Sequence, residues 1–191
     1  GTSKAWTVPL TLANQIPSGT SGTCTITCKT YNGSTLIGTK TVSFKANVPA
    51  AVVPTISDVS MAEAVAGLAA QFGVFVQSKS KVKITIKAAG AYGSTITAYK
   101  TVVDGKTYGG ASPTTGTLSS GTKTVTVTVT DSRGRTAKTT KTLVVVAYSA
   151  PLIKTLVAVR TLEDGTENYE GTHGKIGFSL VISPVSSKNT A

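Results

Sequence analysis

Acidic residues and histidine are scarce in this chain of 191 residues, which has eight Asp and Glu against 19 Lys and Arg and one histidine, His173. Residues 1–50 contain no acid. The acids of residues 51–150 fall mainly in predicted turns and are Asp58, Glu63, Asp104 and Asp131. A glycan-cleaving site needs paired carboxylates beside a cleft, and a general base needs an oriented partner. The sequence supplies neither arrangement, so it predicts no catalytic residue and no enzyme.

Cysteine is also scarce, with only Cys24 and Cys28. Four residues along one strand span about 13 Å at ~3.3 Å per residue, whereas a disulfide needs Cα atoms within roughly 7 Å. We therefore expect two free thiols packed in a core, in a protein folded in a reducing cytoplasm. No cluster of metal-ligating residues surrounds them, and the sequence predicts no metal and no cofactor.

Long apolar runs are absent. No stretch approaches the roughly 20 residues that a membrane-spanning helix needs, so we expect no membrane insertion. Charged residues make up 14% of the chain and hydrophobic residues 40%. Low charge with many threonines is typical of short strands rather than of disorder or a coiled coil.

What the chain does have is an internal repeat of strands and turns, with copies about a hundred residues apart. The alternating strand at 24–28 returns at 125–129, and the closing Pro49 returns as Pro151, so the offset is 101 or 102 residues. A repeat of this length made of strands predicts tandem all-β domains of about 100 residues, as in immunoglobulin-like sandwiches.

The repeat divides the chain into one complete and two partial immunoglobulin-like domains. Residues 1–50 are the C-terminal part of one domain, 51–150 a complete domain, and 151–191 the N-terminal part of another. Half a sandwich without a disulfide buries too little surface to fold alone. We expect that the chain is a fragment of a longer protein; the alternative is that the partial domains pack onto another molecule.

Local patterns predict the individual elements. Residues 5–12 read as an edge strand interrupted by proline, and 61–70 as one weak helix. Asn32-Gly33 predicts a hairpin turn because both residue types tolerate positive φ. Residues 49–54 read as an extended linker between two prolines.

The clearest candidate for a partner surface is a row of lysines on the strand predicted at 78–87, where the apolar side chains face the other way. Its members are Lys79, Lys81, Lys83 and Lys87. The net charge of +11 favours acidic partners. The row either contacts a polyanion such as a cell-wall polymer, or is a solvated face that prevents strand pairing. Nucleic acid is a weaker candidate because this strand lacks aromatic platforms for stacking.

Three further segments carry polar chemistry, and each has a structural interpretation. His173 lies in a loop without a catalytic partner. The acidic stretch 163–170 does not match the calcium-loop spacing and reads as a solvated turn. Residues 131–135 read as a hairpin turn whose Asp and Gly satisfy the backbone geometry, while Arg133 and Arg135 stay solvated.

Several segments resemble tail proteins of bacteriophages that infect Gram-positive bacteria. The most specific is TVTDSRGRTA at 128–137; TYNGSTLIGT at 30–39 and the segments at 76–82 and 90–96 are similar. The third unit also fits through Arg160 and the segments 164–166 and 170–172. The resemblance covers nearly the whole chain.

This resemblance implies the immunoglobulin-like repeat region of a siphophage tail or host-specificity protein. The expected function is that of a non-enzymatic virion structural protein, whose modules in a tail tip or fibre act as spacers, host-attachment modules or both. The expected partners are other tail proteins, copies of itself, or a host cell-wall polymer. The expected location is the virion tail, assembled in the host cytoplasm. The alternative is a bacterial surface adhesin or wall-binding repeat.

Overall fold

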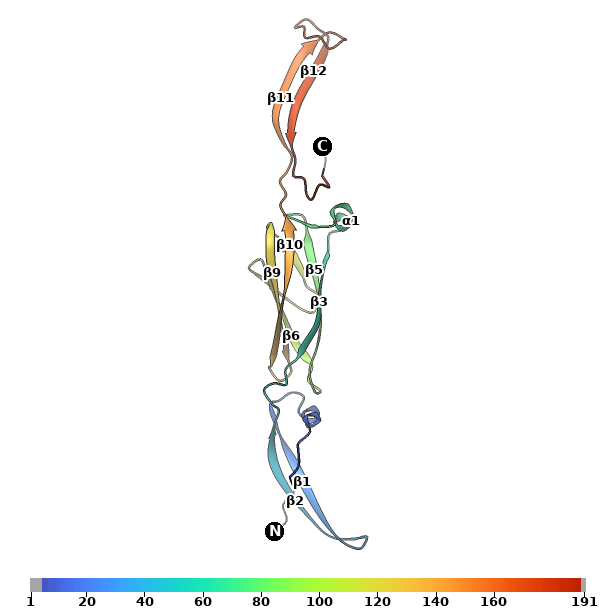
Figure 1. Ribbon diagram of the computed structural model, residues 1–191, viewed down its shortest axis with the longest axis vertical. Coiled ribbons are helices and arrows are strands. Elements are labelled where there is room, and N and C mark those ends of the chain that lie inside the picture. Colours follow the sequence, from blue (N-terminus) through green and yellow to red (C-terminus); the bar gives the residue numbers. More distant parts are fainter. Residues whose placement is uncertain (1–4, 190–191) are drawn as a thin grey trace. The chain divides into compact units, whose positions relative to one another are not determined.

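The computed structural model describes residues 5–189, which are mostly strands (Figure 1). The helical elements are η1, a 3-10 helix at Leu10–Gln15, and α1 at Leu68–Phe72. The strands in chain order are β1 (Ser21–Asn32), β2 (Thr35–Asn47), β3 (Thr55–Glu63), β4 (Phe75–Val76), β5 (Lys81–Ala89), β6 (Ile96–Val103), β7 (Lys106–Gly109), β8 (Thr114–Thr117), β9 (Gly121–Asp131), β10 (Thr136–Val146), β11 (Leu152–Thr161) and β12 (His173–Val181).

The central strands form a β-sandwich. One sheet has the order β4-β10-β9-β6-β7 and the other the order β3-β5-β8. β6 pairs antiparallel with β7 and β9, and the short β4 pairs parallel with β10. β1 pairs with β2, and β11 with β12, as two-stranded antiparallel sheets. The prediction of an all-β sandwich fold is confirmed, and the number of tandem domains and their boundaries stay predictions.

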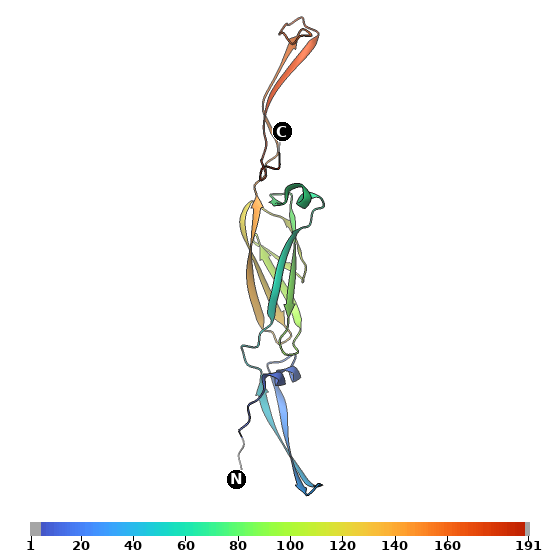
Figure 2. The same cartoon turned by 45° about the vertical axis from the view of Figure 1, so that its right-hand side comes forward.

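By its contacts the chain divides into two compact units. The first comprises Gly1–Met61, Ile84–Pro113 and Thr124–Lys141, and the second comprises Ala62–Lys83, Thr114–Lys123 and Thr142–Ala191. Each unit contains segments of both sandwich sheets. Figure 2 shows these two sheets as two layers. Buried core residues of the first unit include Val59, Ile84, Ile86, Val103, Val125, Val127 and Val129. Those of the second include Val76, Val82, Leu118, Leu143 and Val145.

Period-2 alternation forms the sandwich core. In β5, Val82, Ile84 and Ile86 are buried, whereas Lys81, Lys83 and Lys87 are exposed and Thr85 is half-buried. In β9, Val125 and Val127 are fully buried and alternate with less buried threonines. Successive side chains of a strand point to opposite faces, so the apolar set of each strand enters the core together.

The same alternation does not bury the apolar face of the β1–β2 hairpin. Cys24 and Cys28 are free, as predicted, but Cys24 is only half-buried, Cys28 is exposed, and Ile26 between them is exposed. The prediction that both thiols pack in a core is therefore wrong. A two-stranded sheet has one layer, and burial needs a second layer against that face.

Three other local predictions need correction. Residues 5–9 form no strand, and Leu10–Gln15 forms η1 with Ala13 buried. The helix predicted at 61–70 is wrong at its start, because β3 continues to Glu63 and α1 comprises only Leu68–Phe72. The linker at 49–54 is not simply extended, since Val52 is buried and its N–H donates to the Pro49 carbonyl oxygen.

The β11–β12 hairpin also has a large exposed apolar surface. All residues of β12 are exposed, including Ile176 and Phe178. Leu156 and Val157 of β11 are exposed as well. At the base of the hairpin, the backbone N–H of Ser149 donates to the hydroxyl oxygen of Ser183 at 2.6 Å.

Candidate functional site

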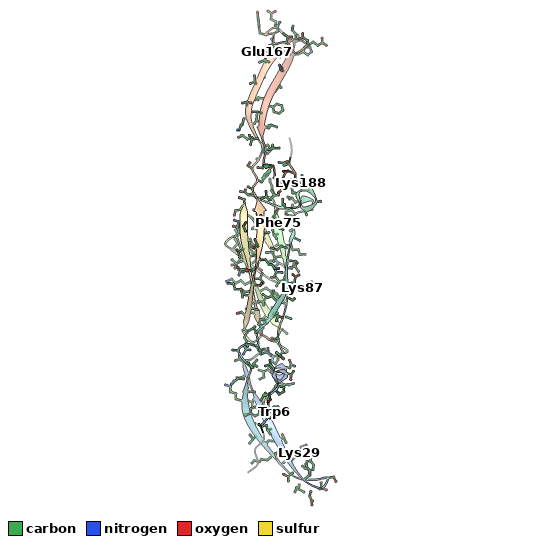
Figure 3. All side chains as sticks on the ribbon, in the orientation of Figure 1. Trp6, Lys29, Phe75, Lys87, Glu167 and Lys188 are labelled. Atoms are coloured by element: carbon green, nitrogen blue, oxygen red, sulfur yellow. The ribbon has the colours of Figure 1, made fainter. Side chains whose placement is uncertain are left out.

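The predicted lysine row lies largely on one strand. Lys81, Lys83 and Lys87 occupy exposed, alternating positions of β5, and Lys87 is labelled in Figure 3. Lys79 lies before this strand, in a turn where its N–H donates to the Val76 carbonyl oxygen. The strand predicted at 78–87 therefore begins three residues late, and Lys79 is outside the row.

The position of β5 in its sheet excludes the interpretation that these lysines prevent the pairing of an exposed strand. β5 is the middle strand of the sheet β3-β5-β8, so both of its edges are paired. Its lysines therefore do not protect an open strand edge, which was one of the two interpretations. The Lys79 ammonium lies 5.3 Å from the centre of the Tyr148 ring, within the range of a cation–π contact.

The turn between β9 and β10 contains a dense network of polar contacts. Asp131 is buried, and its Oδ1 accepts hydrogen bonds from the backbone N–H of Arg133 at 3.0 Å and of Arg135 at 2.9 Å. Gly134 has a φ of 77°, which glycine adopts without steric cost. The aspartate and glycine therefore fix the turn, as the sequence predicted.

The prediction that both arginines of this turn stay solvated is wrong, because Arg133 is buried and Arg135 is half-buried. Arg133 is only 7% exposed. Its guanidinium donates to the Ile16 carbonyl oxygen at 2.8 Å and to the Ala13 carbonyl oxygen at 2.9 Å. It also donates to the carbonyl oxygens of Ala91 and Tyr92 in the β5–β6 loop. One buried side chain therefore joins the segment around η1 to the sandwich.

Arg135 and Ser132 extend this network. The Arg135 guanidinium donates to the carbonyl oxygens of Val48, Pro49 and Val52 at 2.5–2.6 Å. The Ser132 hydroxyl donates to the Pro17 carbonyl oxygen at 2.6 Å. We call Ser132, Arg133 and Arg135, with the carbonyls that they bind, the arginine joint. All of its residues lie in the first compact unit.

The arginine joint is suited to binding backbone carbonyl groups rather than to catalysis. A guanidinium presents five N–H donors in a rigid plane, and here carbonyl oxygens accept from them. Hydrogen bonds to a charged group contribute more than neutral ones, and a buried charge left without partners is costly. Close packing accompanies the joint, since a Cβ added at Gly93 would lie 3.3 Å from the Asn14 carbonyl oxygen.

The remaining candidate residues are used locally. His173 is the exposed first residue of β12, and its Nδ1 lies 3.3 Å from the Thr172 hydroxyl oxygen. In the acidic loop, Asp164 Oδ1 accepts from the Thr166 N–H at 2.9 Å, and these Thr166 hydrogen bonds lower the pKa of Asp164. Within residues 5–189, no three His, Cys, Asp or Glu residues gather as they would around a metal ion.

One small pocket lies within the first compact unit. It has a volume of about 150 Å³ and lies between η1 and the end of β2, with Leu12, Ile16 and Val48 among its lining residues. Pockets for drug-sized ligands measure roughly 300–1,000 Å³, so the volume of this pocket is too small for such a ligand.

None of the helices in the described part of the chain is long and apolar enough to cross a membrane.

Comparison with protein families gives the origin of the chain. Residues 1–167 match the model of a family described as "Siphovirus protein of unknown function (DUF859)". The chain belongs to this siphovirus family. The prediction of a siphophage protein is thereby confirmed, whereas the tail location and the host attachment stay predictions.

Two other comparisons complete the picture of this siphovirus protein. No curated protein matches the chain. Among solved structures, the fibronectin(III)-like modules of Clostridium thermocellum CbhA are similar, with 16% sequence identity and a TM-score of 0.34. That match covers 68% of this chain and 87% of the other.

Proposed function

We propose that this siphovirus protein is a non-enzymatic structural component of the virion tail. Its immunoglobulin-like modules act as spacers in a tail tip or fibre and contact the host surface. Family membership supports a phage origin, and the β-sandwich supports a modular structural role. The alternative, a bacterial surface adhesin, has the same fold in its favour but not the siphovirus family.

The arginine joint is the observation that carries the spacer role. A spacer has to transmit orientation from one segment to the next, which a flexible linker cannot do. In the first compact unit, Arg133 and Arg135 bind the backbone on both sides of the β1–β2 hairpin, at residues 13–16 and 48–52. These bonds fix the base of that hairpin to the sandwich, which is the property that a spacer needs.

The exposed lysines of β5 support the host-contact part of the proposal. Lys81, Lys83 and Lys87 alternate with buried apolar residues, so about 6.6 Å, twice the strand rise, separates Lys81 from Lys83 along the strand. A row of cations on the middle strand of a sheet fits the repeating phosphates of an anionic wall polymer. The partner proposed for this row is a teichoic-acid-like polymer of the host wall.

Localisation tests the structural role. Antibodies against this chain are applied to purified virions of a siphovirus that encodes it, and the particles are viewed by immunogold electron microscopy. The proposal expects gold along or at the end of the tail. Particles without label, together with label on the envelope of uninfected bacteria, would favour the adhesin.

Wall binding is tested separately. Purified Gram-positive cell walls are used to pull down the chain at low and high salt, with Lys81→Glu/Lys83→Glu as the test variant. Lys138→Glu/Lys141→Glu is the matched control, because it makes the same charge change at exposed positions of β10. The test variant is expected to lose most of the salt-sensitive binding and the control to keep most of it. Equal loss in both would remove the lysine row from the proposal.

A further inference from the structure

The loop that joins β11 to β12 forms an open hollow with a volume of about 590 Å³. Pockets for small molecules measure roughly 300–1,000 Å³, so this hollow has room for a small ligand. Its lining residues all belong to the second compact unit and are Val159, Arg160, Glu167, Asn168 and Tyr169. Glu167 is labelled in Figure 3. We call this site the Tyr169 hollow.

Hydrogen bonds within the loop hold the polar residues of the Tyr169 hollow in place. The Asn168 N–H donates to the Arg160 carbonyl oxygen at 2.9 Å, and the Arg160 guanidinium donates to the Tyr169 carbonyl oxygen at 3.1 Å. The Glu170 N–H donates to Asn168 Oδ1 at 2.8 Å. These bonds connect residues 160–170, so they shape the hollow independently of the apolar faces of the two strands. A site that is ordered before binding avoids the entropic cost of ordering it.

Gly171 lets the backbone of this loop pack closely. The residue is buried, and a Cβ added there would collide with the Thr161 carbonyl oxygen. Its N–H donates to the Asn168 carbonyl oxygen at 2.9 Å. Glu167 pairs with Thr161 as an isolated β-bridge. The lining residues Glu167 and Asn168 are therefore both tied to the backbone around Thr161 and Gly171.

The lining side chains combine an aromatic ring with hydrogen-bonding groups. Tyr169 is 83% exposed, so most of its ring is open to a ligand. An aromatic face is partly negative and attracts C–H groups that are partly positive. The side chains of Arg160 and Asn168 supply N–H donors, and the Glu167 carboxylate accepts. A pyranose matches both features, because one face of its ring presents C–H groups and its rim carries hydroxyls that donate and accept.

The charge of the loop selects against acidic ligands. Residues 159–171 contain one base, Arg160, and four exposed acids, Glu163, Asp164, Glu167 and Glu170, which gives a net charge of −3. A negative potential lowers the local concentration of anions. Nucleic acid and acidic polymers are therefore disfavoured here, in contrast to the lysine row of β5.

From these features we infer that the Tyr169 hollow binds a neutral sugar unit, with the pyranose ring stacked on Tyr169. The sugar hydroxyls exchange hydrogen bonds with the side chains of Arg160, Glu167 and Asn168. The inference concerns a different site from the lysine row and does not depend on the tail location.

Titration with free sugars tests the inference on the whole chain of 191 residues. N-acetylglucosamine, glucose and galactose are added separately to isotope-labelled protein, and the amide signals of Asn168, Glu170 and Gly171 are followed by NMR. At least one neutral sugar is expected to shift these signals with a dissociation constant on the order of 1–10 mM, as for a small ligand in an open site. Glucuronic and galacturonic acids, which have a carboxylate in place of the hydroxymethyl group, should bind more weakly than glucose and galactose.

Two pairs of variants locate the binding. Tyr169→Ala should weaken it about three- to tenfold because the ring is lost, whereas Tyr169→Phe should keep most of it. Tyr31→Ala is the matched control, at another exposed tyrosine outside the hollow. Glu167→Ala should also weaken binding, and Glu163→Ala, which removes the same charge from an exposed residue outside the lining, should not. The remaining amide signals show that each variant is folded.

This result is separable from wall binding by the lysine row. Lys81→Glu/Lys83→Glu should leave sugar binding unchanged, and so should high salt, because the ligand carries no charge for salt to screen. A preference for N-acetylglucosamine would indicate a glycan strand as the natural source of the sugar. A preference for a hexose would indicate another polysaccharide.

Three results would overturn the inference. The first is that no neutral sugar shifts the amide signals at concentrations well above the expected dissociation constant. The second is an equal loss of binding in Tyr169→Ala and Tyr31→Ala, which would place the sugar elsewhere. The third is tighter binding of the uronic acids than of the neutral sugars, which would contradict the selection by charge.

Discussion

The Arg133 guanidinium donates a hydrogen bond of 2.9 Å to the carbonyl oxygen of Ala13, which precedes it by 120 residues. Both residues are buried. The bond joins a hairpin turn of the sandwich to the 3-10 helix η1 within the same compact unit. The arginine joint is therefore a tertiary contact between segments that are far apart in the sequence.

Replacing Arg133 should reveal how much this joint contributes. We expect Arg133→Ala to lower the free energy of unfolding by roughly 2–4 kcal/mol, because buried carbonyl oxygens lose a charged donor. Arg133→Lys should recover only part of this, since an ammonium lacks the planar fork. Denaturant titration measures both. The exposed Lys138→Ala is the control and should stay within about 0.5 kcal/mol; a similar value for Arg133→Ala would contradict the role of the joint.

We expect Asp131 to stabilise the turn because its carboxylate oxygen Oδ1 accepts backbone hydrogen bonds. Its Oδ1 accepts from two backbone N–H groups, so Asp131→Ala should cost about 1–3 kcal/mol of unfolding free energy. Asp131→Asn keeps an oxygen acceptor and should cost less. The comparison is made by thermal unfolding of the three proteins. Equal losses for the Asn and Ala variants would mean that the carboxylate charge, rather than the acceptor, stabilises the turn.

Asp164 should titrate below its ordinary pKa of 3.8, because the Thr166 N–H and hydroxyl hydrogen-bond to the carboxylate. A depressed folded pKa gives stabilisation that is present above the unfolded pKa and lost as pH falls through the folded pKa. The group is fully exposed, so the effect on global stability is small. NMR titration of the carboxyl carbon measures the midpoint.

Thr166→Val separates the two causes of this shift. The variant retains the backbone N–H and removes the hydroxyl, so the Asp164 midpoint should rise only part of the way to 3.8. A midpoint at or above that value in the unmodified protein would contradict the local hydrogen-bond pattern.

The two thiols should be accessible in the folded protein. Cys28 is exposed and Cys24 is half-buried, so both should react with a maleimide without denaturant, Cys28 faster. The measurement uses dilute protein and mass spectrometry of labelled peptides. Labelling that needs denaturant would show that the hairpin is covered.

Equivalent positions of the repeat should differ in their response to truncation. Val127→Ala removes two methyl groups from a site that is 0% exposed and should cost about 2 kcal/mol. Ile26→Ala, at the corresponding site of β1, should cost well under 1 kcal/mol in dilute solution. Denaturant titration of both variants checks this difference, and equal costs would contradict the exposure of the β1–β2 face.

Local sequence patterns were enough to predict much of the fold. Alternation of Val82, Ile84 and Ile86 with lysines gave the correct faces of β5. Asn32-Gly33 gave the β1–β2 turn, where Gly33 has a φ of 60°. These predictions succeed because strand alternation and turn geometry depend on residues close together in the chain.

The short segments without a strong pattern were predicted less well. Residues 5–12 contain a proline and alternating apolar residues, yet η1 forms there around the buried Ala13. The stretch 61–70 has helix-forming residues, yet its start pairs in the sheet as the end of β3. In both cases tertiary packing outweighed weak local preference.

The sequence by itself determined that this protein is built of β-strands, which side chains share a face, and that its origin is a siphovirus. Only the tertiary structure decided that Arg133 is buried and that Cys28 and Ile26 are exposed. The physical reason is that burial requires a second surface. A strand specifies which of its faces is apolar, but whether another layer or another backbone segment lies against that face depends on residues distant in the chain.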